Sequence, residues 1–526
     1  VITTEGHTAS FDLTDGIELL AGELAYTTKA VSGWTALEPE LSVTWETNPT
    51  FEPVEITNDM KGKCNIVINA PTGIKAFTVS MLSDYLNNDI GLTELDLLNP
   101  QGLETNFDML NFPYGEKILN QKTVPFDLTN AVALLEGKSG QHIFTMNVTD
   151  NNNKTINQDI TFFVPEAISA TVSDIDLWKN TATITLNNAP EGATVQYKRS
   201  TESEWKNTTK NPNGTFSITP SWITEENDAG KTVYSLDNNC GVFAGATYDW
   251  QILNGEAVVA SGTFETSAGD PIENGDMSQW CETKEMLPLF GSKKITVWYP
   301  GSSWSDSTPG FWDSSNNAGN KTACTQDKTK NASCAWLQAS GVSLVGALAS
   351  GSLFTGTFTY ANMNGTASFG QKYKYTARPT ALRLKYHATL GTVNYNKHNG
   401  PLEKDKDIMD QCSFTVCIVD WDTRHDVQSG TSAPKGIWDP ITMGELPVDK
   451  QNGIIGYGVK YSSENTPGTD LIPLEIPIKY YQQTNAAPDE ENKFTIIISV
   501  STSRYGDYLN GCDKNKIYVD DFEWVY

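Results

Sequence analysis

The sequence predicts an all-β protein built from tandem β-sandwich domains. Short runs that alternate apolar and polar residues recur along the chain, and each is followed by Asn, Gly, Asp or Pro. This texture is typical of antiparallel strands joined by turns, whereas strands alternating with long helices would indicate a parallel sheet. With 526 residues the chain is too long for one ordinary core, so length alone suggests about three or four domains.

The composition is globular but poor in charge, with 38% apolar and 19% charged residues. The 37 Lys and Arg residues against 64 Asp and Glu give a net charge of −27, which argues against nucleic acid or an anionic membrane as a partner. No run of about 18 apolar residues encodes a membrane span. The chain opens on Val1 without a leader, so we expect a processed N-terminus from which a signal peptide or lipid anchor has been removed.

The first segment predicted from composition is residues 1–165, which ends in the apolar strand Asp159–Val164. We expect an Ig-like sandwich here, either one domain or two that divide near residue 66. Helical pattern is scarce in the sequence. The best candidates are two short segments, Leu92–Leu98 and Leu128–Leu135.

Residues 166–268 form a second segment with its own aromatic pattern. Trp178 comes early and Thr247–Trp250 comes late, an arrangement that resembles a fibronectin type III module, in which such aromatics pack in the core. Ser267–Pro271 is a natural linker. Residues 272–526 then form one larger unit, long enough for a jelly roll of two packed sheets.

Three strands of the C-terminal segment can be assigned faces from their alternation. Leu382–Leu390 is apolar at every second residue, so it covers a core and shows a polar face. In Ser352–Tyr360 the aromatic residues share one face and three threonines share the other. Cys412–Val419 is apolar on both faces and should be a central strand. These are sandwich strands.

Five motifs of the same segment follow one another in the order of a known family. They are Asn274–Trp280, Trp312–Gly319, Ala349–Phe358, Phe369–Tyr373 with Arg378-Pro379, and Val519–Phe522. Over residues 272–526 they resemble the putative carbohydrate metabolism domain of surface proteins of gut Bacteroidetes. The resemblance implies a jelly roll similar to carbohydrate-binding modules, and a role in glycan use by a protein that is secreted or lipid-anchored at the outer membrane. The N-terminal half resembles the Ig-like domains that accompany this family.

Two aromatic clusters are the candidate glycan-binding residues. Sugar rings pack their axial hydrogens on indole faces, and polar side chains or Arg fix the hydroxyls. Both clusters lie in sequence typical of loops: Trp298, Tyr299, Trp304 and Trp312 in the first, and Trp421, Arg424 and Trp438 in the second. They predict a protein that binds a polysaccharide or glycoconjugate. The alternative for each Trp is packing at the ends of the sandwich core.

A structural calcium ion is the one cofactor that the sequence suggests. Asn274 and Asp276 open the C-terminal segment, and Asp520 and Asp521 close it. The first and last strands of a jelly roll commonly lie side by side, so these oxygens could share one hard cation. The alternative is a turn at Asn274 and solvated carboxylates. The eight cysteines include no CxxC pair for zinc, and we expect mostly buried free thiols.

Two other functions compete with glycan binding. A glycoside hydrolase needs two facing carboxyls, and the acids near the second aromatic cluster could supply them: Asp420, Asp422, Asp439 and Glu445. No G-x-S-x-G or H-E-x-x-H motif supports another hydrolase. The second competitor is a surface adhesin or structural component, whose sandwiches bind protein and whose Trp residues are simply core. An adhesin would show an exposed apolar patch or an unpaired strand edge.

Overall fold

A computed structural model describes most of the chain and divides it into two compact units, residues 1–168 and 169–526. The described residues are 48–56, 64–286, 295–305, 308–318, 323–330, 333–342, 346–404, 406–483 and 486–526, together with the backbone of four short strands before them. These strands are β1 (Gly22–Thr27), β2 (Ala30–Ser32), β3 (Thr35–Leu37) and β4 (Glu40–Trp45). β1 pairs with β4, and β2 pairs with β3.

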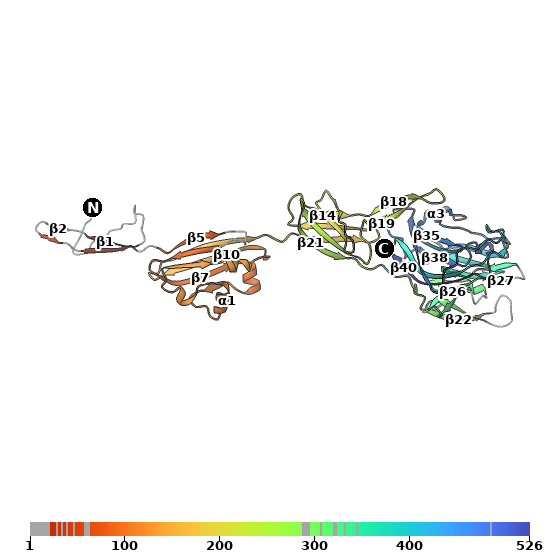
Figure 1. Ribbon diagram of the computed structural model, residues 1–526, viewed down its shortest axis with the longest axis horizontal. Coiled ribbons are helices and arrows are strands. Elements are labelled where there is room, and N and C mark those ends of the chain that lie inside the picture. Colours follow the sequence, from red (N-terminus) through yellow and green to blue (C-terminus); the bar gives the residue numbers. More distant parts are fainter. Residues whose placement is uncertain are drawn as a thin grey trace. The chain divides into compact units, whose positions relative to one another are not determined.

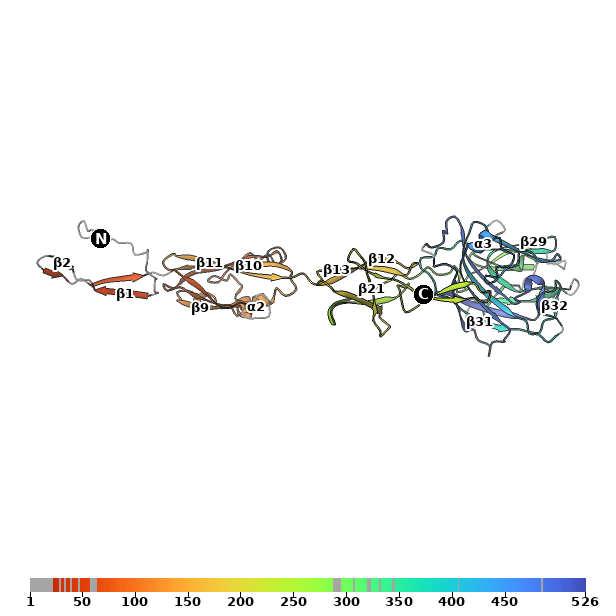
Figure 2. The same cartoon turned by 90° about the horizontal axis from the view of Figure 1, so that it is seen from above.

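The remainder of the first unit is a two-sheet sandwich (Figures 1 and 2). One sheet has the order β11-β10-β7-β8 and the other β5-β6-β9. Their bounds are β5 (Thr50–Ile56), β6 (Cys64–Asn69), β7 (Ile74–Leu82), β8 (Glu94–Asp96), β9 (Thr123–Asp127), β10 (Gly140–Asp150) and β11 (Thr155–Val164). Phe77 of β7 and Phe126 of β9 meet edge to face at 5.1 Å, which joins the two sheets through one core.

Helices are short and few among the described residues, and the predicted all-β fold class is confirmed. The predicted helix at Leu128–Leu135 exists as α2 (Thr129–Ala133). The predicted helix at Leu92–Leu98 is wrong, because Leu95 and Leu97 are buried alternately and β8 pairs with β7. The other helical segments are η1 (Tyr85–Ile90), α1 (Glu104–Leu110), η2 (Gly115–Lys117), η3 (Ser315–Ala318), α3 (Val448–Asn452) and η5 (Gly506–Tyr508).

The second unit begins with a smaller sandwich. Its sheets have the orders β12-β13-β17-β16 and β15-β14-β20-β21. The strands are β12 (Ser169–Asp176), β13 (Thr181–Asn187), β14 (Thr194–Arg199), β15 (Lys206–Asn207), β16 (Thr209–Lys210), β17 (Phe216–Ile218), β20 (Thr247–Asn254) and β21 (Ala257–Glu265). Both sheets contribute to one core, which contains Ile184 and Tyr248.

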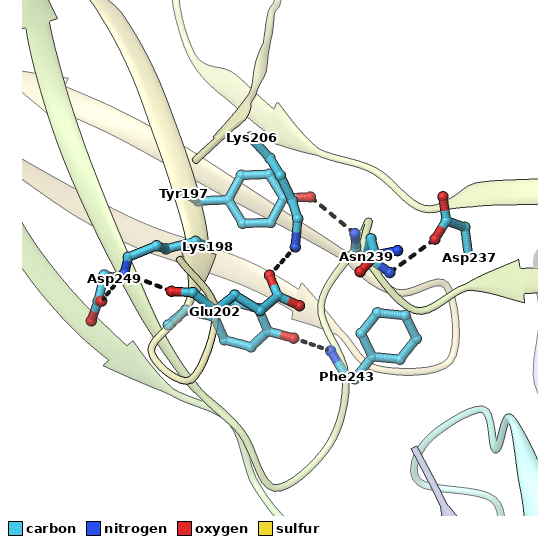
Figure 3. Close-up of polar contacts among 10 residues, drawn as sticks. Tyr197, Lys198, Glu202, Lys206, Asp237, Asn239, Phe243 and Asp249 are labelled. Carbon is cyan, nitrogen blue, oxygen red and sulfur yellow. Dashed lines mark hydrogen bonds and ion pairs between the residues drawn. The ribbon is translucent and has the colours of Figure 1, made fainter. Parts of the chain in front are cut away.

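Polar contacts fix one end of this smaller sandwich (Figure 3). Lys198 donates to the Glu202 carbonyl at 2.8 Å and lies 3.6 Å from the Asp249 carboxylate, while Lys206 forms an ion pair with Glu202. The Tyr248 hydroxyl accepts a hydrogen bond from the Phe243 amide at 2.8 Å. The Gly241 amide donates to the hydroxyl of Tyr197 at 2.9 Å, which ties the loop before β20 to β14.

The aromatic residues expected in the core of this sandwich are buried, with one difference in partner. Tyr248 and Trp250 are buried within it. Trp178 is also buried, but it packs against Tyr375 and the core of the large C-terminal sandwich, with ring centroids 5.6 Å apart. The expectation that Trp178 packs in the core of its own module is therefore wrong. Trp178 belongs to the core of the C-terminal sandwich, because the two sandwiches share a continuous apolar contact.

A hairpin of the smaller sandwich joins the C-terminal one directly (Figure 1). The hairpin consists of β18 (Ser221–Glu226) and β19 (Thr232–Asp237), and β19 pairs with β37 (Lys479–Tyr480) through Tyr234 and Tyr480. Asn227 at its turn donates to the Tyr481 hydroxyl at 2.8 Å. The larger sheet of the C-terminal sandwich therefore ends in strands from the preceding segment.

The C-terminal sandwich packs a five-stranded sheet on this larger sheet. The five-stranded sheet has the order β25-β26-β40-β31-β36, and the larger one β18-β19-β37-β35-β33-β38-β29-β30-β34, with β24 paired to β29. The first comprises β25 (Thr325–Asp327), β26 (Cys334–Gln338), β31 (Ala381–Thr389), β36 (Ile472–Pro477) and β40 (Lys516–Val525). The second adds β24 (Trp312–Asp313), β29 (Ser352–Ala361), β30 (Asn364–Phe369), β33 (Cys412–Trp421), β34 (His425–Gly430), β35 (Ile454–Ser462) and β38 (Phe494–Ser501).

The face assignment of Leu382–Leu390 and the central place of Cys412–Val419 hold in this sandwich, but the latter strand is not apolar on both faces, because Ser413 and Thr415 point away from the core. Leu382 and Leu384 of β31 are buried in the main core, whereas Arg383 between them is exposed. β33 lies between β35 and β38, as a central strand should. Three short pairs complete the domain: β22 (Trp280–Met286) with β23 (Ile295–Pro300), β27 (Ser340–Val342) with β28 (Ala347–Ala349), and β32 (Tyr395–Asn396) with β39 (Asn510–Gly511).

Two expectations about the chain as a whole also bear on its chemistry. All eight cysteines are free thiols, and most of them are buried, as expected. No helix in the part of the chain that the structure describes is long and apolar enough to cross a membrane.

Candidate functional site

A groove of about 550 Å³ lies on the larger sheet of the C-terminal sandwich, within the size range of ordinary ligand sites. It faces away from the main core, because Phe414 and Val416 of β33 point into that core while Ser413 and Thr415 line the groove. Strands β35, β33, β38, β29, β30 and β34 cross it in this order. Two loops, residues 437–445 and 503–509, border it, and further segments that include Ser315, Leu348 and Lys397 complete its lining.

The floor of the groove is a ladder of small hydroxyl side chains. Residues paired directly on adjacent antiparallel strands point to the same face, so the register sets the ladder. One row runs across the sheet through Tyr461, Ser413, Ser501 and Ser352, and the next through Thr415, Ser499 and Phe354. The hydroxyls of Ser352, Ser413, Thr415 and Ser499 make no hydrogen bond with any residue that the structure describes. The floor therefore offers flat, unused donors and acceptors.

Aromatic side chains stand at both sides of this floor. Phe358 and Tyr360 of β29 lie on the side of β30 and β34, where Trp438 also reaches the groove. Tyr505 and Tyr508 come from the other bordering loop. All five are partly exposed, so their rings are open to a ligand.

Arg504 lies stacked among the tyrosines at one end of the groove. Its guanidinium carbon is 3.6 Å from the ring centroid of Tyr461 and 5.0 Å from that of Tyr505. Nη1 donates to the amide oxygen of Gln411 at 3.2 Å. Burial raises the pKa of Tyr461 to about 12, so its ring stays neutral beneath the cation. The stack holds the planar guanidinium in one orientation.

One buried carboxylate anchors the loop that carries Arg504. Asp410 has no exposed surface, and it accepts hydrogen bonds from the Ser503 hydroxyl at 2.6 Å and the Cys512 amide at 2.8 Å. Asn515 donates to the same oxygen at 2.6 Å. Burial raises the pKa of Asp410 although these bonds favour its charged form. Both ends of the loop are thus tied to a single side chain.

Three carboxyls line the groove, and two of them are already engaged. Asp439 accepts hydrogen bonds from the Ile441 and Thr442 amides at 2.8 and 2.9 Å, and Glu445 accepts from the Gly436 amide. They hold the loop that presents Trp438. Asp507 has no carboxylate hydrogen bond to any described residue, and its side chain is exposed to solvent at the groove.

The second predicted aromatic cluster lies beside the groove, but only Trp438 lines it. Trp421 is buried, donates to the Lys450 carbonyl at 2.9 Å and contacts Trp438 with ring centroids 5.5 Å apart. Arg424 donates to the Gly370 carbonyl at 2.9 Å. Trp421 and Arg424 therefore support the wall of the groove from behind.

The first predicted aromatic cluster does not line the groove. Trp312 is fully buried, and its indole N–H donates to the Glu273 carbonyl at 2.7 Å. Tyr299 is fully buried too, and Trp304 stacks on it with ring centroids 4.0 Å apart. Trp298 is half-buried. For Trp312 and Tyr299 the core alternative describes what the structure shows, and both lie in strands, β24 and β23, rather than in the loops that the sequence predicted.

The four acids predicted for hydrolysis do not converge on one place. Asp439 and Glu445 border the groove, as described above. Asp420 pairs with Lys493 at 3.0 Å, and the exposed Asp422 lies near it in the chain; neither lines the groove. Residues that the sequence did not single out, Arg504, Tyr505 and Asp507, stand there instead.

The four residues predicted to hold calcium lie where the first and last strands meet. The Phe522 amide donates to the Gly275 carbonyl at 2.8 Å, so the two ends of the domain are adjacent as the prediction requires. Asp520 is buried, and this burial, with the nearby charges of Asp521 and Asp276, raises its pKa to about 6.

Most of the oxygens at this place have other partners. Asn274 bonds to the backbone of Gln279, and Asp521 pairs with Lys385 at 2.7 Å. Among the described residues, no three His, Cys, Asp or Glu side chains gather as a metal site. The calcium site centred on Asp520 stays a prediction.

Residues 264–525 match a family model described as "Putative carbohydrate metabolism domain". No curated protein matches the chain. Among solved structures, a putative glycoside hydrolase from Bacteroides thetaiotaomicron is 16% identical, with 65% of this chain and 98% of that chain covered and a TM-score of 0.30. One from Bacteroides vulgatus is 15% identical, with 47% and 97% covered and a TM-score of 0.29. A structure of carbohydrate-binding modules from the β-sandwich superfamily is 9% identical, with 92% and 100% covered and a TM-score of 0.15.

Proposed function

Since residues 264–525 are a domain of the putative carbohydrate metabolism family, we propose that the groove on its larger sheet binds a glycan, either a polysaccharide or a glycoconjugate. The proposal moves the binding site from the loop cluster around Trp304 to the groove, and it keeps Trp438 as a contact. It extends to a secreted or lipid-anchored surface location, where such ligands are met. Immunodetection of the protein in fractionated cells would test that location.

The observation that carries the proposal is the hydroxyl ladder between aromatic walls. A sugar ring has apolar C–H faces and a rim of hydroxyls that both donate and accept hydrogen bonds. Aromatic rings such as those of Trp438 and Tyr505 can stack on the apolar faces of the sugar. The hydroxyls of Ser413, Thr415 and Ser499 can form hydrogen bonds with the hydroxyls at its rim. A purely apolar ligand would instead leave these hydroxyls buried without partners, which costs free energy. The lining therefore favours a polyhydroxylated ligand.

Binding fits the groove better than hydrolysis does. A glycosidase requires two carboxyls placed about 5 to 9.5 Å apart across the scissile bond. Of the carboxyls in the groove, Asp439 and Glu445 already accept backbone N–H bonds, which leaves Asp507 as the one without a hydrogen-bond partner among the described residues. An assay for new reducing ends with any bound glycan would test the hydrolase alternative.

The adhesin alternative has one observation in its favour, in the first unit. β11 is an edge strand of its sheet, and Phe163 on that strand is 64% exposed. An unpaired edge with an exposed aromatic can bind another strand. This feature belongs to a different unit from the groove, so it does not compete with glycan binding there.

A pair of matched Trp variants tests the proposed function. Full-length wild type, Trp438→Ala and Trp336→Ala are applied to an array of plant, host and microbial glycans. Trp336 is also half-buried, but it lies on β26 of the other sheet, stacked on Tyr518. We expect binding by wild type and Trp336→Ala, and a loss of about fivefold or more in Trp438→Ala, because a stacked ring contributes on the order of 1 kcal/mol. Silence of the wild type, or equal losses in both variants, would overturn the proposal.

A further inference from the structure

We propose that the glycan bound in the groove is acidic, and that Arg504 binds its carboxylate or sulfate group with Lys397 as a second cation. This inference rests on the proposed function and names the ligand class of the same site. Both side chains line the groove.

Two cations in the groove lack an ion-pair partner among the described residues. Neither Arg504 nor Lys397 pairs with a carboxylate of the residues that the structure describes. Asp439 and Glu445 have their charge stabilised by backbone N–H groups, which leaves Asp507 as the one carboxylate without such partners. The groove holds these two cations and three carboxylates, so its net charge does not select the ligand. What favours an anionic group is that neither cation has an ion-pair partner in the described part of the chain, whereas two of the carboxylates are bonded to backbone N–H groups.

The second argument is the contrast with the other arginines of the C-terminal sandwich. Arg383 bonds to the carboxylates of Glu475 and Glu523 at 2.9 and 3.2 Å. Arg378 donates to a backbone carbonyl at 2.6 Å, and Arg424 donates to a backbone carbonyl at 2.9 Å and to the Gln371 amide oxygen at 3.1 Å. Arg504 has one neutral amide partner and a ring beneath it. Its remaining N–H donors are available in a fixed plane.

The third argument is geometric preorganisation. A guanidinium presents parallel N–H groups that match two oxygens of a carboxylate or sulfate. Stacking on Tyr461 at 3.6 Å removes most of the rotational freedom that Arg504 would otherwise lose on binding. Asp410 fixes the loop below it through Ser503. The net charge of −27 does not prevent such contact, because at physiological salt charges beyond about 8 Å are largely screened.

Titration calorimetry with matched ligands tests the inference on the full-length protein. The probes are trigalacturonic acid, its fully methyl-esterified form, and a carrageenan tetrasaccharide that carries sulfate but no carboxylate. We expect the acid, the sulfate ester or both to bind at least tenfold more tightly than the neutral ester, about 1.4 kcal/mol. Preference between the first and third probes tells whether the anionic group is a carboxylate or a sulfate.

Variants at Arg504 and a control assign the contact. Arg504→Gln and Lys397→Gln should each lower affinity for the acidic probe at least fivefold and lower affinity for the neutral ester by a smaller factor. Arg383→Gln, on the opposite sheet, should change neither. Each variant is folded if its melting temperature and circular dichroism spectrum match those of wild type. If Arg504→Gln does not fold, Lys397→Gln tests the inference in its place.

Other results separate the two proposals. Equal affinity for the acidic and neutral probes, or an Arg504→Gln variant that binds acid like wild type, would overturn the acidic-ligand inference and leave glycan binding standing. Absence of binding by every probe and every array glycan would overturn both.

Discussion

Replacing the buried Asp520 by Asn is expected to stabilise the C-terminal sandwich at neutral pH in the absence of calcium. Asp520 is 2% exposed, and burial raises its pKa to about 6. Its Oδ1 accepts a hydrogen bond from the Asp521 amide at 2.9 Å, which an Asn side chain preserves. The substitution therefore removes the buried charge and little else.

The magnitude follows from the difference in pKa between the two states. An unfolded Asp titrates near 3.9, so the folded state holds this proton about 2 pH units longer. Because the folded pKa is the higher one, the folded state is favoured most below about pH 4 and loses stability as pH rises through 6. At about 1.36 kcal/mol per unit, ionisation costs the folded state at most about 3 kcal/mol.

Thermal unfolding of full-length wild type and Asp520→Asn measures this cost in EDTA at pH 4 and pH 7.5. We expect the variant to melt a few degrees higher at pH 7.5, since a domain of this size gains at most roughly 2 °C per kcal/mol. At pH 4 the difference should shrink towards zero. A variant that melts lower than wild type at pH 7.5 in EDTA would refute the reasoning.

Three further predictions concern calcium, the contact between the two sandwiches and the loop that carries Arg504. If calcium binds at Asp520, adding about 1 mM CaCl2 should raise the melting temperature of wild type and leave Asp520→Asn unchanged, as a ligand that binds only the folded state would; equal responses would exclude the site. Arg378→Ala should lower the free energy of unfolding by roughly 2 kcal/mol in urea titrations, because Arg378 is 1% exposed, donates to the Trp178 carbonyl at 2.6 Å and lies 5.1 Å from the Trp222 ring; no change would show that the contact is dispensable. Asp410→Asn should cost about 1–3 kcal/mol and weaken glycan binding as well, since an amide cannot accept all the bonds that this carboxylate accepts; binding at wild-type affinity would contradict its role as anchor.

The strands and their faces were predictable because side chains alternate with period two. The pattern of Leu382–Leu390 gave its buried and exposed faces, and the high apolar content of Cys412–Val419 indicated a central strand but hid the polar face of Ser413 and Thr415. The wrong helix at Leu92–Leu98 shows the limit of this approach. A short apolar segment fits a helix or a strand equally well, and only pairing of β8 with β7 decides.

The groove could not be located from the sequence, because it depends on register between strands far apart in the chain. Ser413 lies beside Ser501 and Ser352, each of which is an ordinary serine in its own strand. Arg504 and Asp507 lie in a loop whose position is fixed by Asp410, about 90 residues earlier. No local signal marks such a residue.

The loop tryptophans were overrated for a different reason. Gly, Ser and Pro around Trp304 and Trp312 predict irregular backbone, which is correct at Trp304 but wrong at Trp312, because Trp312 begins β24 and pairs with Thr355 of β29. Trp312 belongs to the main core, where its ring lies 5.1 Å from that of Phe522. Phe522 comes from the last strand, which the sequence around Trp312 could not reveal.

Filling the floor of the groove tests its role as the glycan site most directly. Ser499 lies between Thr415 and Phe354 on the floor, and a larger apolar side chain there would occupy the space of a sugar ring. Calorimetric titration of the best array glycan would compare full-length wild type, Ser499→Leu and a control, Thr389→Leu, at an exposed position of β31. We expect binding to disappear in Ser499→Leu and to persist in the control, with melting temperatures close to wild type. Undiminished binding by a folded Ser499→Leu would contradict the claim that the glycan lies in this groove.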